Sequence, residues 1–146
     1  MVRRLMALMV GMSIGLPLIG CGSAQQGLSP ADAEEHLRRS SLEEVAELLR
    51  LYEANHKNKT PAKATDLASY EIGFPGGYTS VKEGKVTVNW NTPFIEGATD
   101  KIIAYEKEAP ESGGYVLMQD GTTIKKLTAD EFKSTPQAGS PRKASK

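Results

Sequence analysis

The chain has very few of the residues on which metal and nucleophile chemistry usually depends. Its 146 residues include one cysteine, Cys21, and two histidines, His36 and His56. Neither HExxH nor paired CxxC spacing occurs, so no metal or cofactor is predicted. His36 lies beside acidic residues and His56 beside lysine, and we interpret both as solvated side chains rather than as a base or a metal ligand. A single thiol allows no internal disulfide, so a domain must be held together by packing alone.

The chain also lacks an excess of charge of either sign and the common nucleophile motifs. Lys and Arg together number 18, as do Asp and Glu, which argues against nucleic acid as a partner. No GxSxG motif occurs, and neither Ser80 nor Ser112 has a predicted base beside it. The pairs Gly76-Gly77 and Gly113-Gly114 do not have the sequence of phosphate loops. We therefore predict that the protein is not an enzyme.

The N-terminal stretch has the layout of a secretory signal. Arg3 and Arg4 precede an uncharged, mostly apolar run over residues 5–18, which ends in Leu18-Ile19-Gly20-Cys21. A large aliphatic residue, a small residue and cysteine at the end of such a run resemble the lipobox of bacterial lipoproteins. The resemblance implies cleavage before Cys21 and attachment of lipid, including palmitate, to that residue. The alternative is an uncleaved transmembrane helix, because the chain stays uncharged through Ala24 and Gln25 and this longer run comes near the roughly 20 residues that a span needs.

The resemblance implies a location in the cell envelope, outside the cytoplasm and on the periplasmic side of a membrane. Gly22 follows the cysteine where some lipoproteins retained in the inner membrane have Asp, which slightly favours the outer membrane. We expect four parts: a signal peptide over 1–20, a tether over 21–40, a globular domain over 41–133, and a disordered basic tail over 134–146.

The globular part is predicted to begin with an amphipathic helix. Ser29-Pro30 predicts only a short helix inside the tether, whereas Ser41-x-x-Glu44 is a capping box that predicts the start of the main helix. The helix is expected to end in the polar residues 55–59, before Pro61. Its apolar residues share one face: Leu42, Val45, Ala46, Leu48, Leu49 and Tyr52.

Strand patterns follow the helix. A first hairpin is predicted from residues 78–82 and 85–90 around Glu83-Gly84, and a central strand from residues 101–107. A second hairpin is predicted around Asp120-Gly121, from residues 114–119 and 122–127. Thr128-x-x-Glu131 predicts a short final helix. The fold class is therefore α+β, with one N-terminal amphipathic helix packed on an antiparallel sheet of two hairpins plus a central strand.

The two hairpins share a Gly-Gly-Tyr-x4-acid-Gly pattern, offset by 37 residues from Gly76 to Gly113. We favour repeated use of turn residues over an internal duplication. The aromatic residues are expected mostly in the core, with a partly exposed patch for a partner as the alternative: Tyr70, Phe74, Tyr78, Trp90, Phe94, Tyr105 and Tyr115.

Carboxylates gather in the second half of the chain and leave two alternatives open. In an enzyme they would serve a small envelope hydrolase, and in a binding module they would hold Ca²⁺. The DxDxDG spacing of a calcium loop is absent, so we favour solvated loop charges. The residues are Glu96, Asp100, Glu106, Glu108 and Glu111.

A second resemblance covers roughly residues 42–127. The sequence from Leu51 through Asn55 and Pro61 to Leu67 resembles the end of the long helix and the following loop in type II secretion pseudopilins. The Asp120-Gly121 turn is similar to a late turn in some pilin-like chains. The resemblance implies a pilin-like fold, although the lipobox replaces the prepilin leader of that family. The expected function is that of a non-catalytic, lipid-anchored interaction or structural module with a protein partner in the envelope, the alternatives being the hydrolase and a Ca-stabilised, pseudopilin-related secretion component.

Overall fold

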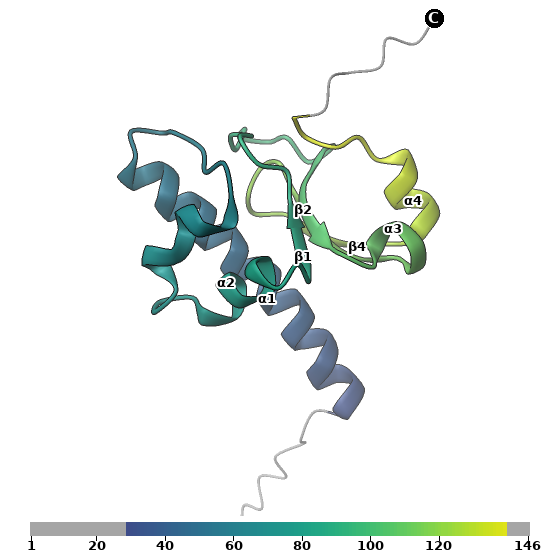
Figure 1. The fold of residues 1–146 in the computed structure, drawn as a ribbon. Helices are drawn as coiled ribbons and strands as arrows, with labels where there is room; N and C mark the ends of the chain where they lie inside the picture. Colours follow the sequence, from purple (N-terminus) through teal and green to yellow (C-terminus); the bar gives the residue numbers. More distant parts are fainter. Residues whose placement is uncertain (1–28, 140–146) are drawn as a thin grey trace, which may run out of the picture.

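The computed structural model describes residues 29–139, which fold as an α+β domain (Figure 1). A four-stranded antiparallel sheet has the order β1-β2-β3-β4, so that each strand pairs with the next in sequence. The elements in chain order are α1 (Pro30–Asn55), the 3₁₀ helix η1 (Ala64–Tyr70), α2 (Pro75–Lys82), β1 (Val86–Val88), β2 (Ile102–Glu106), α3 (Ala109–Ser112), β3 (Gly114–Met118), β4 (Ile124–Leu127) and α4 (Ala129–Ser134).

Helix α1 begins eleven residues earlier than the main helix predicted from the sequence. Ser29 is its N-cap, Pro30 occupies the first turn, and the Ser29 hydroxyl accepts a hydrogen bond from the Asp32 amide at 3.2 Å. The predicted start at Ser41 is wrong, because the helix runs through this residue without a break and the Ser41 hydroxyl donates to the Leu37 carbonyl. Residues 31–39 are mostly good helix formers, so nothing between the two caps ends the helix.

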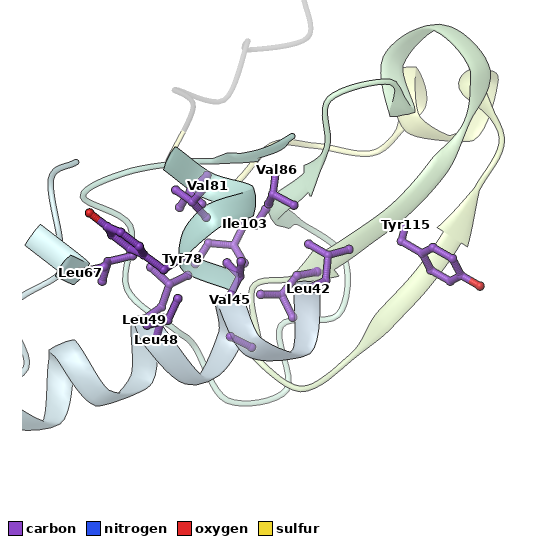
Figure 2. Close-up of a cluster of buried hydrophobic side chains, with 14 of the residues drawn as sticks. Leu42, Val45, Leu48, Leu49, Leu67, Tyr78, Val81, Val86, Ile103 and Tyr115 are labelled. Atoms are coloured by element: carbon purple, nitrogen blue, oxygen red, sulfur yellow. The ribbon is translucent and has the colours of Figure 1, made fainter. Parts of the chain in front are cut away.

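The apolar face predicted for the helix is confirmed over α1. Leu42, Val45 and Leu48 are fully buried. They pack with side chains from η1, α2 and one face of the sheet (Figure 2), among them Leu67, Tyr78, Val81, Val86, Ile103 and Tyr115.

The prediction of a strand over residues 78–82, as the first arm of the first hairpin, is wrong, because these residues belong to helix α2. Tyr78 and Val81 are spaced for one helical face and both are buried. The absence of a side chain at Gly77 lets α2 approach α1 closely: a Cβ on Gly77 would lie 2.6 Å from the Cβ of Glu44. The similar Gly-Gly-Tyr sequences therefore adopt different structures, a helix at Gly77 and a strand at Gly114.

The central strand and the second hairpin are confirmed as β2 and as the β3–β4 pair. Asp120 Oδ1 accepts the amides of Thr122 and Thr123 at 3.1 and 2.9 Å, and Gly121 has a φ of 74°. Both faces of the sheet are covered. Ile103 and Leu117 belong to the cluster beneath α1 and α2, whereas a second cluster joins α3 and α4 to the sheet through Ile102, Ala109, Val116, Met118 and Phe132.

The final helix is confirmed, with a capping box between Thr128 and Glu131. Contacts with the sheet continue beyond residue 134, where the sequence predicts a tail. The Ile102 amide donates to the Pro136 carbonyl at 2.9 Å, and the Ala138 amide donates to the Ile102 carbonyl at 2.8 Å. Ala138 is 2% exposed, so the packed part of the chain reaches at least this residue.

The expected signal peptide, Cys21 and the last seven residues of the expected tail lie outside the described residues. Within residues 29–139, even the 26-residue α1 is too polar to span a bilayer, and no other helix has the length and apolar character for it.

Candidate functional site between α1 and the sheet

The carboxylates considered for a hydrolase or a Ca²⁺ site do not form one site. Glu96, Asp100, Glu108 and Glu111 are exposed, whereas Glu106 is buried. Among residues 29–139, no three acidic, histidine or cysteine side chains are placed to hold a metal ion together. Their arrangement gives no support to either alternative.

Glu106 has a different surrounding from the other four acids because Arg38 reaches it from α1. Arg38 Nε lies 2.7 Å from Glu106 Oε1, and Nη2 lies 2.6 Å from Oε2. Glu106 Oε2 also accepts the Tyr115 amide at 2.7 Å. The side chain of Glu106 is 11% exposed and that of Arg38 is 41% exposed. A bidentate, partly desolvated ion pair therefore joins the first half of α1 to β2, and the hydrogen bond from the Tyr115 amide links it to β3.

A second polar contact lies one helical turn earlier. The Tyr115 hydroxyl donates to Glu35 Oε1 at 2.5 Å, and Lys126 Nζ donates to the same oxygen at 3.0 Å. The charged ends of Arg38 and Lys126 lie 6.0 and 5.6 Å from the centre of the Tyr115 ring. Glu35, Arg38, Glu106, Tyr115 and Lys126 are named the Arg38 cluster below.

The hydrogen bonds of the Arg38 cluster keep its charges fixed. The hydrogen bond from Tyr115, followed by that from Lys126, lowers the pKa of Glu35 below its ordinary value. The same Tyr115–Glu35 bond raises the pKa of the tyrosine, and the bond to Glu106 raises the pKa of Arg38. Each of these three shifts favours the protonation state that the group already has at neutral pH.

Two open grooves lie on either side of Arg38, which lines both. One has a volume of about 530 Å³ and lies between α1, the α2–β1 turn and the β2–α3 turn. The other has a volume of about 500 Å³ and lies against the starts of β3 and α4. The larger groove is lined by Glu34, Arg38, Ser41, Ser80, Glu83, Gly84, Lys85, Val86, Glu106, Lys107, Glu108 and Ser112.

The larger groove presents charges of both signs. Glu83 pairs with Lys85 at 2.7 Å. Glu34, Lys107 and Glu108 make no ion pair within the part of the chain that the structure describes. Such a surface can bind a polar partner that carries both amino and carboxylate groups.

The residues considered as nucleophiles or bases do not meet. Ser80 and Ser112 line the larger groove, but neither histidine does. His36 and His56 are both exposed, and His56 stacks on Tyr52 with ring centres 3.9 Å apart. The interpretation of both as solvated side chains agrees with their exposure.

The positions of the aromatic side chains agree with the expectation that most of them lie in the core. All seven named from the sequence are buried or half-buried, with Tyr78 and Tyr115 the most deeply enclosed. Trp90 and Phe94 line a narrow recess together with Glu53, whose pKa is raised by burial. Within residues 29–139, the large apolar side chains left exposed are aliphatic instead: Leu37, Ile72 and Ile95.

The Arg38 cluster was missed by the sequence reasoning, which assigned Glu35 and Arg38 to the tether. Arg38 and Glu106 lie 68 residues apart, and no local pattern links them. The available signal was the cap at Ser29-Pro30, because no helix-breaking residue separates it from Ser41.

A scan of family models, a search of curated proteins and a search of solved structures each found no match to this chain.

Proposed function

We propose that this chain is a lipid-anchored protein of the bacterial cell envelope whose α+β domain binds another protein and performs no chemistry of its own. The lipobox sequence Leu18-Ile19-Gly20-Cys21 supports the anchor. The observation that carries the binding role is the pair of open grooves around Arg38, the larger of which is lined by charges of both signs.

A protein partner suits this surface better than a uniform polyanion does. The unpaired Glu34 and Glu108 would repel a polyanion, whereas a polypeptide segment can place a lysine or arginine beside them and an acidic residue beside Lys107. The groove therefore fits a short segment of mixed charge.

We further propose that the fold is pilin-like. The support is the order of elements, in which the long helix α1 comes first and an antiparallel sheet follows after η1 and α2, together with the resemblance of residues 51–67 to pseudopilins. Filament assembly is not part of the proposal, because the lipobox stands where pseudopilins have a prepilin leader.

The anchor is tested by labelling cells with palmitate and measuring the intact mass of the purified protein. The wild type should carry label and start at a lipid-modified Cys21, whereas Cys21→Ala should carry none. A wild-type chain that begins at Met1 with a free thiol would contradict the anchor.

The binding role is tested with a photo-crosslinking amino acid placed at single positions in cells. At Lys107, in the larger groove, it should yield an adduct with one defined protein. At Thr122, an exposed residue of the β3–β4 turn that does not line the groove, it should yield none. Equal adducts at both positions, or none at Lys107, Lys85 and Glu108, would contradict a partner in this groove.

A further inference from the structure

The continuity of α1 limits how far the grooves can lie from a lipid at Cys21. The sequence predicts a tether that runs to residue 40 and leaves the domain free to move from there. In the structure the helix already begins at Pro30 (Figure 1), and its first turns extend beyond the sheet. Any hinge between anchor and domain must therefore precede Pro30.

The Arg38 cluster joins the first half of α1 to the sheet. Glu35 and Arg38 are three positions apart, hence neighbours on the helix surface, and they contact β2, β3 and β4 through Glu106, Tyr115 and Lys126. A helix held by contacts to three strands cannot swing at residue 40 without breaking all of them.

Chain length then sets an upper limit on distance, whatever conformation the preceding residues adopt. Nine residues from Cys21 to Pro30 can span at most about 32 Å. Eight further residues of α-helix add about 12 Å, so the backbone of Arg38 lies no more than about 44 Å from Cys21. A fully extended chain from Cys21 to Arg38 would instead reach about 61 Å.

We propose that the groove beside Arg38 binds a membrane-proximal segment, of mixed charge, of a protein in the same membrane. This inference rests on the proposed function, since it needs both the lipid at Cys21 and a partner in the groove. The limit of about 44 Å between Cys21 and Arg38 means that the grooves cannot bind a partner surface that lies much farther than this from the bilayer. The same short connection keeps the grooves close to any segment that emerges from the bilayer nearby, which raises its effective concentration.

The experiment lifts the groove away from the bilayer without changing the domain. A spacer of eight EAAAK repeats is inserted after Ser23 in the full-length protein, so that the lipobox and Ser29 keep their neighbours. Forty helical residues add about 60 Å. A flexible Gly-Ser spacer of equal length is the matched control, because it allows a distant reach but also permits the groove to return to the bilayer. The photo-crosslinker stays at Lys107 in every variant.

We expect the adduct seen without a spacer to fall at least tenfold with the helical spacer and to persist with the flexible one. An adduct that persists or increases with the helical spacer would overturn the inference while leaving the binding role intact. Absence of an adduct in the protein without a spacer would instead count against the proposed function itself. Palmitate labelling of each variant verifies that the anchor is unchanged.

Discussion

The carboxylate of Glu44 in α1 accepts the backbone amide of Gly77 in α2, with 2.7 Å between Oε2 and the nitrogen. The N-cap residue of α2, Phe74, has no side-chain hydrogen bond to offer. Glu44 therefore supplies from a neighbouring helix the acceptor that a capping side chain would normally provide, and its negative charge lies near the positive end of the α2 dipole.

This contact requires a residue without a side chain at position 77. In Gly77→Ala the new Cβ would lie 2.6 Å from the Cβ of Glu44 and 2.9 Å from backbone atoms of α1, which cannot rotate away. We expect the free energy of unfolding to fall by about 1–3 kcal/mol, as measured by chemical denaturation. Gly73→Ala is the control, because its nearest neighbour atom would be 3.7 Å away, and it should change stability by less than about 0.5 kcal/mol.

Removal of Arg38 should destabilise the domain because Glu106 would remain buried without its cation. Breaking a fully buried ion pair costs about 3–5 kcal/mol, and the partial exposure of Arg38 reduces this for Arg38→Ala to about 1–3 kcal/mol. Arg39→Ala is the matched control, since Arg39 pairs with Glu43 on the exposed surface and should cost below about 0.5 kcal/mol. Equal losses of stability in the two variants would contradict the role of Arg38.

Acidification should weaken the β3–β4 turn through Asp120. Burial by itself raises the pKa of this carboxyl, but hydrogen bonds from Thr123 and Thr122 outweigh it and hold the pKa below the ordinary 3.8. Because the pKa is lower in the folded state, the contribution of ionised Asp120 is complete above about pH 4 and is lost as the pH falls through the folded value.

Melting temperatures of Asp120→Asn and wild type between pH 7 and pH 2.5 test this dependence. The variant should be less stable at pH 7, and the difference should shrink toward pH 2.5. Asp100→Asn, an exposed substitution in the loop between β1 and β2, should follow the wild type throughout. A difference between Asp120→Asn and wild type that stays constant with pH would contradict the assignment.

Residues 136–138 should contribute to stability although the sequence places them in a tail. A chain that ends at Thr135 loses both hydrogen bonds to Ile102, that between Asn89 and Gln137, and buried Ala138. We expect its free energy of unfolding to be about 1–3 kcal/mol lower than that of a chain that ends at Gly139. Equal denaturation midpoints for the two chains would show that this pairing does not stabilise the fold.

The parts of the fold that the sequence predicts well carry strong local signals. Asp120-Gly121 fits a tight turn, and the β3–β4 hairpin forms around it. Ile102 and Ile103, apolar on both faces, indicate a strand covered on both sides, and β2 is such a strand. The apolar stripe of α1 is likewise a periodic pattern within one element.

The missed parts depend on contacts between distant segments. The glycines of α2 disfavour a helix in isolation, and Glu44 compensates from 33 residues away. The candidate site was missed for the same reason. In the sequence, Arg38 and Glu106 each have the pattern of a solvated charge, and they form an ion pair only when α1 packs on the sheet. Local rules describe isolated elements, whereas these side chains acquire their roles only in the packed domain.

Backbone hydrogen exchange over residues 34–40 of the membrane-anchored protein tests the central claim most directly, that the first half of α1 belongs to the domain. We predict slow exchange in the wild type and a selective loss of protection there in Arg38→Ala, with residues 45–49 still protected. Exchange of residues 34–40 in the wild type at the rate of an unstructured peptide would contradict the account, because these residues would then belong to a flexible tether and not to the folded domain.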